Sequence, residues 1–109
     1  DIKVPFSVYI HGDFNLDNII YDPEERHINF IDLHRSQYMD YVQDVSVFMV
    51  SCYRLQVLDP RRRRRAMALI LAFYRFAARR ARKGGDHSFE LRLALGLARS
   101  FVTSTRFIL

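Results

Sequence analysis

Cysteine and long apolar runs are scarce in this sequence, and each scarcity excludes a class of structure. Only one of the 109 residues is a cysteine, so Cys52 cannot form a disulfide within the chain, and its apolar neighbours predict a buried, unreactive thiol. The longest apolar run, residues 66–74, is far too short to span a bilayer. No secretory signal is visible. We therefore expect a soluble, cytoplasmic protein.

Acidic residues are nearly missing from the second half of the chain. Residues 1–59 hold 4 Lys/Arg and 10 Asp/Glu, a net charge of −6, whereas residues 60–109 hold 13 Lys/Arg and 2 Asp/Glu, a net charge of +11. This asymmetry favours an anionic partner for the basic half, or helices with solvated arginine faces.

The run of five arginines at residues 61–65 does not by itself indicate nucleic-acid binding. Five successive helical residues point around the whole cylinder, and no single-strand groove or recognition-helix pattern accompanies them. Nucleic acid is therefore disfavoured as a partner. An anionic substrate and a membrane surface remain open.

Apolar patterning predicts a single α+β domain with several short strands in the first half. Residues 8–10 read as a strand. Residues 19–21 and 28–31 read as a hairpin around the turn at residues 22–27, where Pro23 follows Asp22. Residues 33–39 are expected to form a loop. Strands this short must pack on helices to be stable.

Helical periodicity covers the rest of the chain. We expect a helix over residues 40–56, a second over residues 61–83 that starts at Asp59-Pro60 and stops at Gly84-Gly85, and a third that is capped by Asp86 or Ser88 and runs to about residue 105. The middle of the second helix, residues 66–76, is apolar nearly all round and is expected to be largely buried. No internal repeat or linker is visible.

The third helix carries two opposed patterns. One face holds Leu91, Leu95, Ala98 and Val102, with other apolar residues beside it, and is expected to face the core. Arginines repeat every seven residues, and we expect them to form a solvent-facing stripe at Arg92, Arg99 and Arg106.

Polar residues at the ends of apolar runs suggest phosphoryl-transfer chemistry. His11, Gly12, Asp13 and Asn18 follow the first strand, and Asp32 follows the run of residues 28–31. Such a site needs one carboxylate to accept the proton of an attacking hydroxyl, and an amide oxygen and a second carboxylate to hold Mg²⁺ on the nucleotide phosphates. Mg²⁺ prefers oxygen ligands and keeps several waters, so one or two protein oxygens suffice.

Three segments, in order, resemble the aminoglycoside phosphotransferase and choline kinase-like family, which is related to protein kinases. The motif His11-Gly12-Asp13, with Asn18 five residues after the aspartate, resembles the catalytic loop. The segment of residues 32–36 resembles the one that carries the family's magnesium-binding aspartate. The segment of residues 40–46 resembles the next signature, two aspartates four residues apart that open a helix.

The resemblance implies roles for these residues. Asp13 would be the catalytic base, and Asn18 and Asp32 would bind Mg²⁺ and, through it, ATP. His11, Gly12 and Asp44 would support the catalytic loop. The sequence departs from the family pattern at Asn15, where many relatives carry histidine, and at His34, where relatives often carry glycine.

The resemblance also predicts the domain organisation and the substrate class. The chain would form the C-terminal lobe of a protein-kinase-like fold, with the catalytic loop and a small β-hairpin packed on a mainly helical bundle. The N-terminal nucleotide lobe of the same protein, with its Gly-rich loop and strand lysine, would precede residue 1, and residues 1–109 alone would be inactive. The acceptor would be a small molecule with a hydroxyl. A polycationic acceptor is disfavoured, because Asp86 and Glu90 are the only acidic residues in the second half.

Two other functions stay open at this point. A metal-dependent phosphoesterase would use His11, Asp13, Asp32 and His34, although two-metal hydrolases usually need further His or Asp ligands. A pseudokinase or basic interaction module would keep the fold without turnover. Intact Asp13, Asn18 and Asp32 weigh against lost chemistry.

Overall fold

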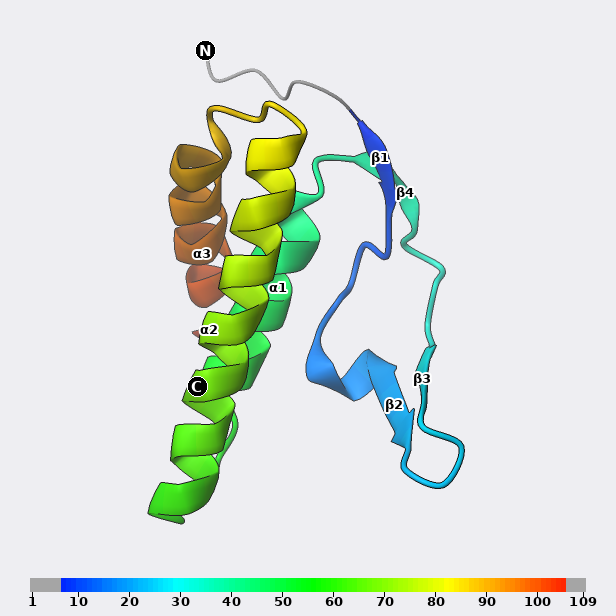
Figure 1. Cartoon of the computed structure of the whole chain (residues 1–109), viewed down its shortest axis with the longest axis vertical. Coiled ribbons are helices and arrows are strands. Elements are labelled where there is room, and N and C mark those ends of the chain that lie inside the picture. The colour runs from blue at the N-terminus through cyan, green and yellow to red at the C-terminus, as the bar shows by residue number, and fades with distance from the viewer. Residues whose placement is uncertain (1–6, 106–109) are drawn as a thin grey trace.

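The protein folds into a layer of three helices that faces a layer of short strands (Figure 1). The computed structural model describes residues 7–105. The helices are α1 (Val42–Tyr53), α2 (Pro60–Lys83) and α3 (Phe89–Thr105). α1 packs against both α2 and α3. The predicted α+β class is confirmed.

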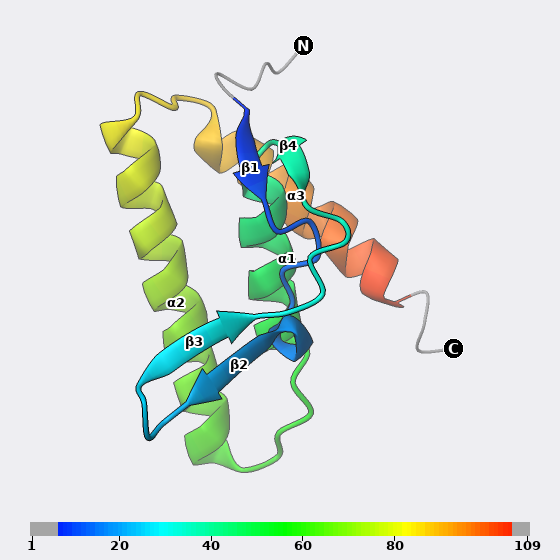
Figure 2. The ribbon, with the colours of Figure 1, turned by 90° about the vertical axis from the view of Figure 1, so that its right-hand side faces the viewer.

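Two antiparallel ribbons make up the strand layer. β1 (Val8–Ile10) pairs with β4 (Gln37–Met39), and β2 (Ile19–Asp22) pairs with β3 (His27–Phe30). A single 3₁₀ turn, η1 (Leu16–Asn18), leads into β2. Turned by 90°, the molecule shows the β2–β3 hairpin in front of the helices, at the level of the N-terminal half of α2 (Figure 2). The predicted first strand and hairpin are confirmed.

β4 was not predicted, because residues 33–39 were expected to form a loop throughout. Its three side chains are all exposed, so no alternation of apolar and polar residues reveals it. Tyr38 lies opposite Tyr9, with the ring centroids 5.1 Å apart. The strand therefore exists because β1, 27 residues or more away in the chain, offers it a pairing edge.

The limits of α2 follow from its capping residues, as the sequence predicts. The Asp59 carboxylate accepts the backbone N–H of Arg61 at 3.0 Å, and Pro60 occupies the first turn, where its missing N–H costs nothing. At the other end the Gly84 N–H donates to Arg80 O, and Gly85 adopts φ +72°. Because a left-handed residue cannot continue the helix, α2 stops there.

The core lies between the three helices and is built mainly from small and branched side chains, with one phenylalanine. Its buried members are Val42, Val45, Ala77, Ala78, Ala81, Phe89 and Leu93. Three alanines in the last turns of α2 leave room for a close approach of the neighbouring helices. Cys52 is also buried, as predicted, and burial raises the pKa of its thiol to about 11.

Two predictions of burial are wrong. The apolar middle of α2 is largely exposed, with Met67, Leu69 and Phe76 each about half accessible. Only the last turns of α2 supply core residues. The middle of α2 is apolar on all sides, but neighbouring elements do not cover all of these sides. On α3, the expected inward face is exposed at Leu91, Leu95, Ala98 and Val102, whereas Leu93 is buried.

The expected arginine stripe of α3 is wrong at Arg92, which is 6% exposed. The buried carboxylate of Asp86 and the partly buried one of Asp40 bind its guanidinium, so Arg92 faces inward. Arg99 is exposed, as predicted. Arg106 lies outside the described residues.

Candidate functional site

The loop after β1 is held by a carboxylate at the start of α1. Asp44 Oδ2 accepts the backbone N–H of His11 at 2.7 Å, and Oδ1 accepts the N–H of Gly12 at 3.0 Å. Asp44 lies in the first turn of α1, where a negative charge also complements the helix dipole. Two charge-assisted hydrogen bonds thereby attach the loop to a rigid element.

The His11 ring joins this loop to the end of β3. The backbone N–H of Asp13 donates to His11 Nδ1 at 3.1 Å, so Nδ1 is the unprotonated nitrogen. Nε2 then carries the proton and donates to the carbonyl oxygen of Ile31 at 2.9 Å. The ring is neutral in this arrangement, and it couples Asp13 to the residue that precedes Asp32.

Gly12 lies where no side chain fits. It adopts φ +91°, and a Cβ at this position would lie 2.1 Å from the carbonyl oxygen of Arg35. Ser36 Oγ donates to the carbonyl oxygen of His11 at 2.9 Å. The segment after Asp32 therefore passes directly against the catalytic-loop candidate, and only a glycine allows this close approach of the two backbones.

The Asp13 carboxylate is oriented by two amide side chains. Asn15 Nδ2 donates to Asp13 Oδ1 at 3.1 Å, and Asn18 Nδ2 donates to Oδ2 at 3.3 Å and to the Asp13 carbonyl oxygen at 2.8 Å. Asn18 is 7% exposed, and among residues 7–105 its amide oxygen accepts no hydrogen bond. The amide nitrogen is therefore committed to Asp13, and the oxygen is available to a ligand.

The register of the hairpin places Asn18 opposite Ile31, the residue before Asp32. Ile19 pairs with Phe30, and the N–H of Ile31 donates to the carbonyl oxygen of Asn18 at 2.9 Å, so Asp32 follows one residue beyond Asn18's partner. Asp32 adopts φ +62°, an uncommon conformation for a residue with a side chain, and such outliers concentrate at functional sites. Its Oδ1 lies 2.6 Å from His34 Nδ1.

Phe14 anchors the loop and was missed from the sequence. Its ring contacts those of Phe30, Phe48 and Phe73, at centroid distances of 5.6, 5.4 and 6.3 Å. The signal was present, since a phenylalanine in a largely polar loop needs an apolar neighbour. Packing on α1 and α2 thereby fixes the backbone on the C-terminal side of Asp13.

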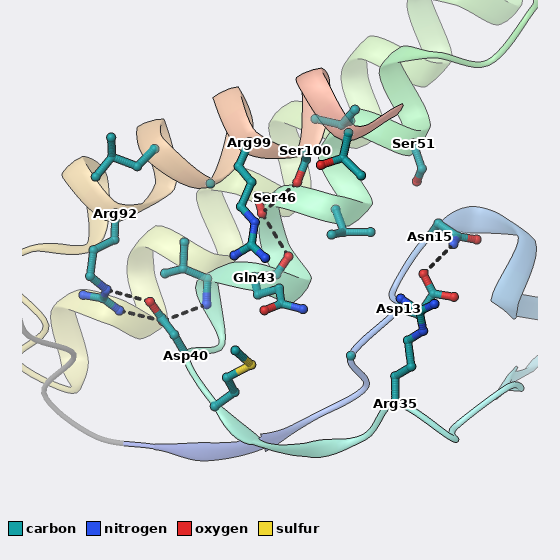
Figure 3. A pocket seen from close by; sticks show the side chains of 18 of the residues that line it. Asp13, Asn15, Arg35, Asp40, Gln43, Ser46, Ser51, Arg92, Arg99 and Ser100 are labelled. Atoms are coloured by element: carbon teal, nitrogen blue, oxygen red, sulfur yellow. Dashed lines mark hydrogen bonds and ion pairs between the residues drawn. The ribbon is translucent and has the colours of Figure 1, made fainter. Parts of the chain in front are cut away.

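A pocket of about 660 Å³ opens beside Asp13, between the loop, α1 and α3. This volume falls within the usual range of small-molecule sites, roughly 300–1,000 Å³. Figure 3 shows Asp13, Asn15 and Arg35 on one side of the pocket, and Gln43, Ser46, Arg99 and Ser100 on another. The sequence did not predict that residues of α3 would meet Asp13 across one cavity.

One end of this pocket is closed by a buried ionic cluster. Arg92 donates to Asp40 from Nε and NH2, both at 2.9 Å, and to Asp86 from NH1 at 2.6 Å and NH2 at 3.0 Å. The Tyr41 hydroxyl donates to Asp86 Oδ2.

Hydrogen bonds from Arg92 hold the pKa of Asp86 below its ordinary value, and burial together with the bond to Asp86 raises the pKa of Tyr41. The cluster fixes the start of α1 against α3. The sequence assigned no such role to Arg92 or Asp86.

The structure thus brings most of the predicted site residues together. Hydrogen bonds connect Asp13 with His11 and Asn18, and link Asn18 and His11 to the residue before Asp32. Within residues 7–105, no three His, Cys, Asp or Glu side chains form a group that could hold a metal ion, so the phosphoesterase alternative gains no support. No helix in the same range is long and apolar enough to cross a bilayer.

Comparison with known proteins identifies one family. The model of the phosphotransferase enzyme family matches residues 3–84, which include the loop, the hairpin, α1 and α2. Comparisons with curated proteins and with solved structures give no match. The matched range covers more than half of the chain, and it contains the three segments that carry the resemblance.

Proposed function

Because the chain belongs to the phosphotransferase enzyme family, we propose that it takes part in moving the γ-phosphoryl group of ATP to a hydroxyl of a small molecule, with Asp13 as the catalytic base. The observation that carries this proposal is the position of Asp13. Its carboxylate is oriented by two amide donors and lines a pocket large enough for a metabolite.

In the proposed reaction, the acceptor hydroxyl donates its hydrogen bond to Asp13. The acceptor oxygen forms a bond to the γ-phosphorus, the bond between that phosphorus and the bridging oxygen breaks, and ADP leaves with the bridging oxygen. The hydroxyl proton passes to the Asp13 carboxylate. Positioning supplies most of the rate in such transfers, and the hydrogen bonds from Asn15 and Asn18 provide it here.

The residues present fit a magnesium site made of oxygen ligands. The Asn18 amide oxygen accepts no hydrogen bond among the described residues, and Asp32 presents an exposed carboxylate one residue past Asn18's hairpin partner. Asn18 and Asp32 would hold the ion. When bound, Mg²⁺ neutralises charge on the nucleotide phosphates.

We further propose that residues 1–109 act as the C-terminal lobe, with the nucleotide held against an N-terminal lobe of the same protein. Both faces of β3 are exposed, and Ile28 and Phe30 present apolar surface there. Exposed apolar patches of this kind mark contact surfaces. The sequence of residues 1–109 contains no Gly-rich phosphate loop, so a second lobe would supply it.

The test uses the complete natural protein, purified and supplied with Mg²⁺-ATP and a panel of hydroxylated metabolites. ADP release is recorded for the wild type, for Asp13→Asn and for Asp17→Asn. The last is a matched control, because Asp17 is an exposed aspartate in the same loop. We expect Asp13→Asn to lower kcat by at least about 10³-fold while nucleotide binding stays intact, and Asp17→Asn to keep its rate. Near-normal turnover of Asp13→Asn would refute the assignment.

A further inference from the structure

The walls of the pocket beside Asp13 carry an excess of positive charge. Arginines enter from three elements: Arg35 from the segment after Asp32, Arg54 from the end of α1, and Arg92 and Arg99 from α3. The carboxylates that line the same space belong to Asp13 and Asp40. The net charge that this pocket presents to a ligand therefore depends on which of these charged groups already form ion pairs.

Arg92 is paired with both Asp40 and Asp86, so this cluster of one guanidinium and two carboxylates carries a net charge of −1 and offers no free positive charge. Both oxygens of Asp40 receive hydrogen bonds from Arg92, whose remaining donors serve Asp86 and Ser88. The Arg92 side chain is 5% exposed, and its hydrogen bonds within the cluster leave no donor for a ligand. Asp40 likewise offers no free carboxylate to a cationic group.

The other three arginines keep their charge available to the pocket. Among residues 7–105, Arg35, Arg54 and Arg99 form no ion pair within 4.0 Å. Arg54 is held in place by stacking over the Phe101 ring, with its guanidinium carbon 5.8 Å from the ring centroid. Figure 3 shows Arg99 extending from α3 toward Gln43, with Asp13 across the pocket. Three unpaired guanidiniums therefore share the space with one unpaired carboxylate, that of Asp13.

Uncharged polar groups occupy the wall between the charges. Ser46 and Ser100 meet at 3.4 Å between Oγ atoms, where Gly96 lets α3 approach α1; a Cβ on Gly96 would lie 3.0 Å from Ser46 Oγ. Hydroxyl and amide groups of this kind suit a ligand with several hydroxyls. The pocket thus combines the Asp13 carboxylate, a polar wall and arginines that have no carboxylate partner among the described residues.

We propose that the acceptor is a hydroxylated oxyanion, a sugar or polyol that bears a carboxylate or a phosphate, with its charged group bound by Arg99 and Arg54 and its reacting hydroxyl at Asp13. This inference rests on the proposed function for the identity of the reacting hydroxyl. Guanidinium groups bind carboxylates and phosphates with paired hydrogen bonds, whereas an amino sugar would meet three like charges.

The test measures equilibrium binding, which does not depend on turnover. The complete natural protein is titrated by calorimetry, without nucleotide, with four hexose derivatives that differ in charge: gluconate, glucose 6-phosphate, glucose and glucosamine. We expect one of the two anions to bind at least about tenfold more tightly than glucose and glucosamine. Gluconate and glucose 6-phosphate distinguish a carboxylate from a phosphate.

Two variants locate the binding. Arg99→Gln should weaken anion binding by about tenfold, the loss expected for one charge-assisted interaction. Arg79→Gln, which removes the same charge from an exposed position on α2 away from the pocket, should leave it unchanged. Thermal unfolding of both variants checks that they are folded.

Equal affinity for charged and neutral sugars, tighter binding of glucosamine, or equal loss in Arg99→Gln and Arg79→Gln would overturn the oxyanion inference. The proposed function would survive that result, because it depends on ADP release and on Asp13→Asn. Conversely, selective anion binding that depends on Arg99, together with unchanged turnover in Asp13→Asn, would uphold the site and refute the catalytic assignment.

Discussion

The carbonyl oxygen of Arg35 lies 2.1 Å from the place that a Cβ on Gly12 would occupy. Because Gly12 has no Cβ, the segment after Asp32 can pass directly against the loop that carries Asp13. Replacing Gly12 by alanine would add a left-handed penalty of about 1–2 kcal/mol and an overpacking cost of about 1–3 kcal/mol. We expect Gly12→Ala to lower the free energy of unfolding by about 2–5 kcal/mol, measured by urea denaturation.

Gly85→Ala is the matched control for this substitution. Gly85 also has a positive φ, of +72°, but nothing lies within 4 Å of a Cβ there. It should therefore show only the conformational penalty, about 1–2 kcal/mol. Equal losses of unfolding free energy in the two variants would show that the close approach of Arg35 to Gly12 adds nothing to the cost of the substitution.

Asp44→Asn tests the support of the loop. An asparagine keeps the shape but turns an NH₂ group toward one of the two backbone N–H donors of His11 and Gly12. We expect a loss of about 1.5–3 kcal/mol in stability, since both bonds are charge-assisted, together with a lower kcat in the complete protein. Asp22→Asn, in a solvent-exposed turn where Asp22 also accepts two N–H groups, should cost less than about 1 kcal/mol. A larger loss of stability in Asp22→Asn than in Asp44→Asn would contradict the role of Asp44 in supporting the loop.

Removing Arg92 should destabilise the fold far more than removing Arg99. Arg92→Met leaves the buried Asp86 carboxylate unpaired, and breaking a buried ion pair in this way costs about 3–5 kcal/mol. Arg99→Met, one heptad further along α3 and exposed, should change stability by less than about 0.5 kcal/mol. Chemical denaturation of both variants measures the difference. Similar values for the two would mean that the cluster does not hold α1 and α3 together.

The same cluster predicts acid sensitivity. The pKa of Asp86 is lowered in the folded state, mainly by the hydrogen bonds that it accepts from Arg92. The ionised carboxylate therefore stabilises the fold, and this contribution is fully present above the ordinary pKa of an aspartate. That contribution is lost as pH falls through the lower, folded-state pKa. Unfolding free energies of wild type and Asp86→Asn should differ most near pH 7 and converge as the pH falls below the ordinary pKa of an aspartate. A constant difference across this range would exclude the linkage.

Local signals along the chain were sufficient to predict most elements. Asp59-Pro60 and Gly84-Gly85 bound α2 because capping depends on a few neighbouring residues. The hairpin follows from two short apolar runs around a turn, and the His11-Gly12-Asp13 motif with Asn18 identifies the family through residue types and spacing. The catalytic and metal-binding roles of Asp13, Asn18 and Asp32 stay predictions until the variants are assayed.

By itself, then, the sequence determined the order of the helices and of the strands other than β4, their approximate limits and the residues that belong to the loop. Only the tertiary structure decided that Arg92 is buried, that residues 67–71 of α2 are largely exposed, that β4 exists, and that Arg54 and Arg99 line the same pocket as Asp13. The physical reason is the range of the interactions. Caps and turns are stabilised by residues a few positions away, whereas burial, strand pairing and pocket charge depend on partners distant in the chain.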